Sequence, residues 1–203
     1  MNRQFLMTAA MALFLSACGN QTGPSTQEPD TTTTATDSSK TESAYFPVYD
    51  FLRNEVEYVD SLPIGIKKFT MSGKKLDSGY IQLEEFHTLA GEFLVPELYD
   101  SAFKKLFKES SFFDRSANTS TFFYKSDDES STVKRIDVVT QKGNVYDEVK
   151  SLYIEKNLVS GDSSFIKKMY WKPKMNFQIT TISSAASGKS KNEQVKVVWD
   201  TSE

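Results

Sequence analysis

The segment Phe165-Ile166-Lys167-Lys168-Met169-Tyr170-Trp171-Lys172 decides the fold class of this chain. Its side chains alternate along an extended backbone, so that Phe165, Met169 and Trp171 share one face and Ile166, Lys168 and Tyr170 share the other. A period of two is typical of a β-strand that buries one face and exposes the other. The segment therefore predicts a sheet with a hydrophobic side and a more polar side.

Five further segments near it show strand patterns and are separated by turn-rich stretches. The six predicted strands are residues 119–125, 132–141, 148–156, 165–172, 176–183 and 194–200. Parallel neighbours would need crossover connections of about a dozen residues or more, and the connections here are short. We therefore expect an antiparallel meander of about six strands.

Helical spacing dominates the sequence that precedes these strands. It predicts helices at residues 47–60, 84–95 and 97–109, with a short hairpin of segments 66–71 and 75–83 around Ser72-Gly73-Lys74. Helices followed by strands indicate an α+β fold in which N-terminal helices pack on the meander. Residues 44–203, about 160 in all, suffice for one core, and we expect a single domain.

Residues 1–43 contain two segments of a different kind. Arg3 precedes an apolar run from Phe5 to Ala17 that is too short to cross a bilayer, and this order is typical of a signal peptide, residues 1–17. Residues 19–43 contain no aromatic and no large aliphatic side chain, so ordering them would not be compensated by burial. We predict a disordered tether over residues 18–43, with a coil span of about 25–30 Å.

The signal ends in Leu15-Ser16-Ala17-Cys18, which resembles the lipobox of bacterial lipoproteins. The resemblance implies cleavage between Ala17 and Cys18, diacylglycerol on the Cys18 thiol and a fatty acyl chain such as palmitate on the new amine. Cys18 is the only cysteine of the chain, so it has no disulfide partner within it. In enterobacterial lipoproteins an aspartate after the cysteine retains the protein at the inner membrane. Gly19 at this position implies an outer-membrane lipoprotein that faces the periplasm.

A second short motif lies in the predicted tether. Asp30-Thr31-Thr32 resembles the sites at which some Bacteroidota attach O-glycans to exported proteins, which makes Thr31 a candidate glycosylation site. The same three-residue pattern recurs at Asp60-Ser61-Leu62 and Asp100-Ser101-Ala102, so the motif is of low specificity.

Composition argues against several functions. The chain has 24 basic and 27 acidic side chains and a net charge of −3, which does not favour nucleic-acid binding. One histidine and one cysteine do not suffice for a zinc site, and no phosphate-binding or nucleophile motif is present. We therefore expect no metal, no cofactor and no catalytic activity. His87, the sole histidine, has no carboxylate three, four or seven residues after it and is interpreted as a boundary or surface residue.

The remaining sequence leaves three functions open. The first is a non-catalytic binding or assembly module with an envelope protein, lipid or glycan as its partner. The 15 phenylalanines and nine tyrosines also allow a carrier or chaperone of a lipid or another apolar ligand, with a cavity between sheet and helices, although a plain hydrophobic core explains them too. The third is a hydrolase that uses two facing carboxylates from the set Glu109, Asp114, Asp137 and Asp147.

Overall fold

The computed structural model describes residues 45–143, 148–185 and 187–200. The chain divides into two units, residues 1–41 and 42–203, and every described residue belongs to the second. The predicted signal peptide, the lipidation site Cys18, the cleavage site after Ala17 and the glycosylation site Thr31 lie outside the described residues. Among the helices that are described, none combines the length and the apolar character needed to span a bilayer.

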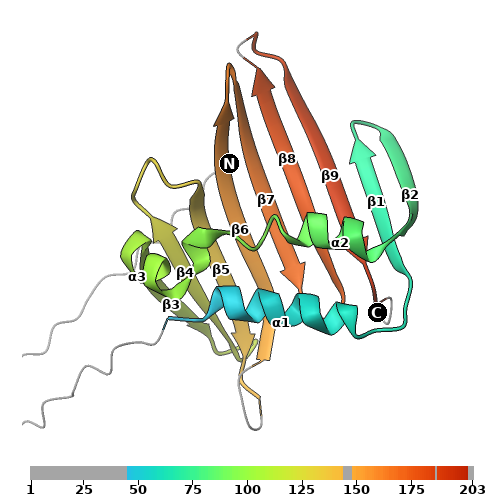
Figure 1. Cartoon of the computed structure of the whole chain (residues 1–203). Helices are drawn as coiled ribbons and strands as arrows, with labels where there is room; N and C mark the ends of the chain where they lie inside the picture. The colour runs from blue at the N-terminus through green and yellow to red at the C-terminus, as the bar shows by residue number, and fades with distance from the viewer. Residues whose placement is uncertain (1–44, 144–147, 186, 201–203) are drawn as a thin grey trace, which may run out of the picture. The chain divides into compact units, whose positions relative to one another are not determined.

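The described residues form one antiparallel sheet of nine strands (Figure 1). Neighbouring strands follow the order β2-β1-β9-β8-β7-β6-β5-β4-β3, so β9, the last of the described strands, pairs with β1, the first of them. The seven strands from β3 to β9 form a meander, as short connections predict. The strands are β1 (Ile66–Ser72), β2 (Lys75–Ile81), β3 (Phe107–Asp114), β4 (Thr119–Ser126), β5 (Val133–Gln141), β6 (Glu148–Ser160), β7 (Ser163–Lys172), β8 (Asn176–Ala185) and β9 (Ser190–Val198).

The α+β class and the antiparallel meander are confirmed, whereas a sheet of about six strands is wrong. The predicted hairpin exists, but it joins the main sheet because β1 pairs with β9. The third predicted helix ends at Leu106, and β3 begins at Phe107. Phe103, Leu106 and Phe107 match helical spacing, and β3 is an edge strand whose side chains are mostly exposed, so it lacks the alternation that reveals a strand.

The helices are likewise not all N-terminal to the strands. They are α1 (Val48–Asp60), α2 (Leu83–Ala90), the short 3₁₀ helix η1 (Pro96–Leu98) and α3 (Asp100–Leu106), and the β1–β2 hairpin separates α1 from α2. Figure 1 shows α1 and α2 lying across the same side of the sheet. The buried residues of α1 recur at intervals of three or four, namely Val48, Leu52, Glu55 and Val59, which places one stripe of the helix against the strands.

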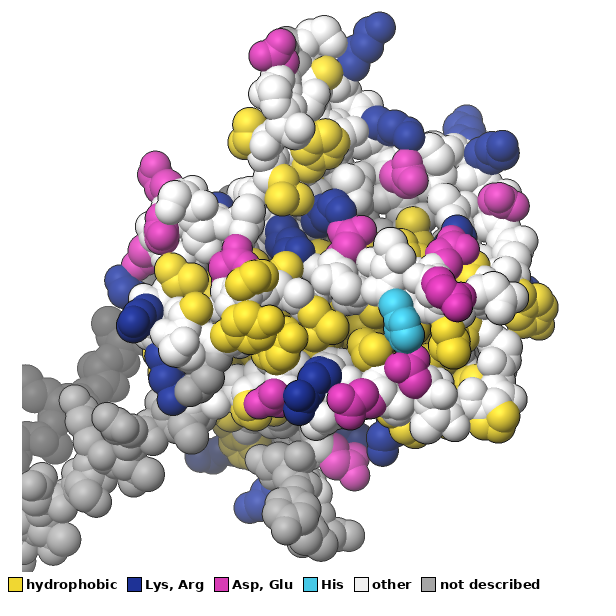
Figure 2. Space-filling model, viewed as in Figure 1, with side chains coloured by type: hydrophobic (Ala, Val, Ile, Leu, Met, Phe, Trp, Pro, Cys, Tyr) yellow, Lys and Arg dark blue, Asp and Glu magenta, His cyan; other side chains and the backbone are white. Residues whose placement is uncertain are grey.

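Aromatic rings fill the space between these helices and the strands behind them. Trp171 stacks on Phe177 with ring centroids 5.1 Å apart, and Phe93 meets Trp171 edge-on at 5.1 Å. Phe86 and Trp199 extend the same cluster. Figure 2 shows the side that the helices cover, where charged side chains border a band of apolar ones. Phe86, Phe93 and Phe177, which the sequence offered for a ligand cavity, are therefore core residues.

Candidate binding surface

A buried carboxylate joins α1 to the turn between β7 and β8. Glu55 is only 7% exposed, and its Oε2 accepts hydrogen bonds from Trp171 Nε1 at 3.2 Å and from the backbone N–H of Lys174 at 2.7 Å. Lys174 has a φ of +61°, a backbone conformation that few non-glycine residues adopt. Glu55 thus holds a tight turn against the core, which is a structural role.

Two lysines contact the loop that follows α2. Lys156 is 7% exposed, and its Nζ donates to the carbonyl oxygen of Glu92 at 2.5 Å. Lys167, one strand away, forms an ion pair with the carboxylate of Glu92. Burial lowers the pKa of Lys156, and the nearby charge of Lys167 acts in the same direction, while Glu92 opposes it. Glu92 contacts both ammonium groups and thereby connects the loop after α2 to strands β6 and β7.

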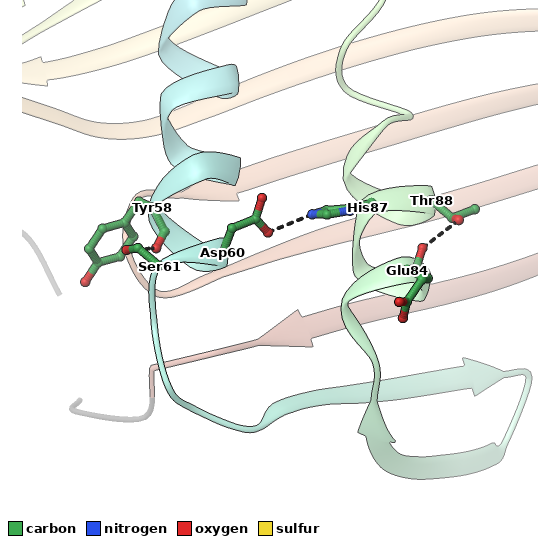
Figure 3. A network of polar contacts seen from close by, with 6 residues as sticks. All are labelled: Tyr58, Asp60, Ser61, Glu84, His87 and Thr88. Carbon is green, nitrogen blue, oxygen red and sulfur yellow. Dashed lines mark hydrogen bonds and ion pairs between the residues drawn. The ribbon is translucent and has the colours of Figure 1, made fainter.

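His87 has a carboxylate partner that sequence reasoning missed. Its Nε2 lies 2.7 Å from Oδ1 of Asp60, the last residue of α1 (Figure 3). Spacing along a single helix does not reveal this partner, because Asp60 is 27 residues away in sequence. Two hydroxyls drawn in Figure 3 donate to backbone carbonyls and not to this pair: Thr88 to that of Glu84 and Ser61 to that of Tyr58. Both side chains of the pair are partly exposed, and the pair links α1 to α2 at the surface.

Those carboxylates considered for hydrolysis that the structure describes do not form a facing pair. Glu109 faces the helices, where Tyr124 hydrogen-bonds to it, while Asp137 lies on the opposite face of the sheet. Asp114 ends β3 and accepts hydrogen bonds from the hydroxyl and backbone of Ser116, which lower its pKa. Asp147 lies outside the described residues. Among the residues described, no three acids, histidines or cysteines cluster as metal ligands would.

The face of the sheet opposite the helices, here called the open face, is the candidate binding surface. None of the described helices lies on it (Figure 1). Strand registers place side chains of β4, β5, β6, β7, β8, β9 and β1 opposite one another in a single row across this face. The row consists of Phe123, Asp137, Tyr153, Tyr170, Gln178, Lys196 and Phe69.

A second row beside the first is rich in charge. It consists of Lys125, Arg135, Glu155, Lys168, Thr180, Gln194 and Met71, taken in the same strand order. Together the two rows carry four basic and two acidic side chains among four aromatic rings. A surface of this composition can stack against flat or apolar parts of a partner and hydrogen-bond to its polar groups.

Contacts among these side chains hold several of them in place. Arg135 donates from Nε to Asp137 Oδ1 at 2.7 Å and lies 5.7 Å from the ring centre of Phe123. Tyr153 donates its hydroxyl to Glu155 at 2.8 Å. Burial raises the pKa of Tyr153, and the hydrogen bond to Glu155 raises it further, so its hydroxyl stays protonated at neutral pH. The surface is thus partly pre-organised for binding.

The sequence identified part of this surface. It placed Lys168 and Tyr170 on one face of a strand, but it did not show that Tyr153 lies directly opposite Tyr170. Alternation within a strand predicts which side chains share a face. It does not predict the register between strands, which decides which of them are neighbours.

No protein-family model matches the chain, and no curated protein matches it significantly.

Proposed function

We propose that this chain is an exported cell-envelope lipoprotein, anchored through Cys18 at the outer membrane and facing the periplasm, whose domain is a non-catalytic binding or assembly module. The lipobox Leu15-Ser16-Ala17-Cys18 supports the anchor. The open face, with its rows of aromatic and charged side chains, is the observation that carries the binding function. Its partner is an envelope protein, lipid or glycan.

The anchor is tested by the mass of the mature protein. We expect a chain that begins at Cys18 and carries added acyl mass, and Cys18→Ala should abolish labelling with radioactive palmitate because the thiol is the first acceptor. A mature chain that begins elsewhere, or an unmodified Cys18, contradicts the anchor. The same spectrum tests Thr31, because a mass equal to polypeptide plus lipid contradicts glycosylation there.

The binding surface is tested by site-specific photo-crosslinking in intact envelopes. A photoreactive amino acid replaces Tyr170 on the open face, and a comparison variant carries it at Tyr58, a partly buried tyrosine of α1 on the helix-covered side. We expect one discrete crosslinked product from position 170 and none from position 58. Lys168→Glu should reduce the product from position 170, because Lys168 lies beside Tyr170 on the same surface. Equal products from both positions, or none from position 170, contradict the open face as the binding surface.

Two observations favour this function over the alternatives. Packed rings of Phe93, Trp171 and Phe177 occupy the region in which an apolar carrier would hold its ligand. The described carboxylates Glu109 and Asp137 lie on opposite faces of the sheet, where they cannot flank one glycosidic bond.

A further inference from the structure

β2 is an edge strand with one side unpaired. It pairs with β1, and no described strand lies beyond it (Figure 1). Edge strands present rows of unpaired N–H and C=O groups, and natural proteins often protect them with proline, bulges or repeated charges. β2 contains no proline, and its register with β1 runs from Ser72–Lys75 to Ile66–Ile81 without a shift. The edge is therefore regular enough to accept another strand.

The hairpin turn shows which backbone groups of β2 point outward. Ser72 and Lys75 flank a two-residue turn in which Gly73 has a φ of +60°, and such a turn is closed by a hydrogen-bonded pair. Hydrogen-bonded and non-bonded pairs then alternate along the ladder. The residues of β2 whose N–H and C=O point away from β1 are consequently Leu76, Ser78 and Tyr80.

The side chains of these three residues all lie on the open face. Leu76 is 68% exposed and Tyr80 is 77% exposed, both high values for large hydrophobic side chains. Beside them is a mainly apolar hollow of about 310 Å³, lined by Phe69, Met71, Leu76, Gln194 and Lys196. Apolar surface next to unpaired backbone indicates a partner that supplies both a strand and an apolar side chain.

The sequence of β2 is complementary to itself. In an antiparallel pair of β2 strands with a two-fold axis at Ser78, Leu76 of one copy faces Tyr80 of the other, an aliphatic–aromatic pair. On the opposite face Asp77 meets Gly79, and Lys75 meets Ile81. This register places no two like charges opposite each other. It also pairs the residues whose backbone groups point outward, so each opposed pair exchanges two hydrogen bonds.

We propose that two copies of this chain associate through antiparallel pairing of their β2 strands, centred on Ser78. The two sheets then continue into one another, and Tyr80 of each copy packs on Leu76 and the adjoining hollow of the other. The interface is isologous, so it closes as a dimer and leaves no further β2 edge exposed. This inference stands on the geometry of β2 and does not depend on the proposed anchor or on the partner of the open face.

Cysteine crosslinking of the full chain tests the dimer, in a Cys18→Ala background so that each variant carries a single thiol whether or not Cys18 is lipidated. Ser78→Cys places one thiol per copy at the two-fold axis, where a short bis-maleimide can link the copies, because opposed Cα atoms are about 5.5 Å apart. Ser110→Cys is the matched control, since Ser110 is an exposed serine on the same face of the other edge strand, β3. We expect a covalent dimer from position 78 and none from position 110.

The register is tested by introducing one charge and then its opposite at the position that faces it in the other copy. Tyr80→Glu in the Ser78→Cys background places a carboxylate opposite Leu76 and should reduce the crosslinked fraction by about tenfold or more, equivalent to about 1.4 kcal/mol. Adding Leu76→Lys should restore it, because each glutamate then faces a lysine of the other copy. Within one chain these residues are four positions apart on a strand, so the rescue cannot arise intramolecularly.

Three results overturn the proposal. They are equal crosslinking from positions 78 and 110, a product from position 78 that contains a different protein, and failure of Leu76→Lys to rescue Tyr80→Glu while circular dichroism shows a native fold.

Discussion

The two faces of the nine-stranded sheet differ in what covers them, and adjacent residues of β7 show the consequence. Trp171 is fully buried under α1 and the loop after α2, while Tyr170, its neighbour, is 40% exposed on the open face. Burial of a large apolar side chain contributes about 1.5–3 kcal/mol, whereas an exposed ring contributes little to folding. The helix-covered face thus provides the stability of the domain, and the open face is available for binding.

The largest expected effect is a difference in folding stability between alanine variants of Trp171 and of Tyr170. Trp171→Ala should lower the free energy of unfolding by about 3–5 kcal/mol because it leaves a cavity among Phe93, Phe177 and Trp199. Tyr170→Ala should lower it by less than about 1 kcal/mol. Urea unfolding followed by circular dichroism measures both. Similar losses for the two variants would contradict the division of roles between the faces.

A smaller effect is expected at the buried carboxylate beneath α1. Glu55→Ala leaves Trp171 Nε1 and the N–H of Lys174 without their acceptor and should destabilise the domain by about 2–3 kcal/mol. Glu57, two residues away, is exposed and forms only a long ion pair with Arg53, so Glu57→Ala should cost less than about 0.5 kcal/mol. Equal midpoints for the two variants in urea would refute the structural role of Glu55.

The smallest expected effect is a pH dependence at Lys156, on the helix-covered face. Because burial lowers its pKa in the folded state, the unfolded state binds more protons as pH rises towards 10.5, and stability increases over that range. The difference in unfolding free energy between Lys156→Met and the wild type should therefore change between pH 7 and pH 10, in favour of the wild type at high pH. Lys105→Met, at an exposed lysine of α3, is the comparison variant. A constant difference for Lys156→Met would contradict the lowered pKa.

Sequence patterns predicted those elements in which one face is buried and the other exposed. The helix at 47–60 and the strands at 119–125 and 165–172 were predicted to within a few residues, because their periods of 3.6 and 2 reflect that burial. β3 was missed because, as an edge strand, it exposes both faces, and its apolar residues continue the spacing of α3. The extent of the helix predicted at 84–95 was too long, since α2 ends at Ala90.

The open face and the other side-chain contacts were less predictable than the fold because they join residues far apart in sequence. His87 and Asp60 meet only because α1 and α2 lie side by side on the sheet. Tyr153 and Tyr170 form a pair only through the register of β6 with β7. Neither contact has a local signal, since both depend on how segments far apart in sequence are aligned.

The sequence by itself determined the α+β class, the antiparallel meander and the alternation that sends Trp171 inward and Tyr170 outward, because each depends on local spacing or connection length. It also carries the motif at Cys18 on which the proposed anchor rests. Only the tertiary structure decided that β1 pairs with β9 and that β2 is an edge strand. It also decided that aromatic and charged side chains form rows across the open face. These features arise from pairing between distant strands, which local periodicity does not encode.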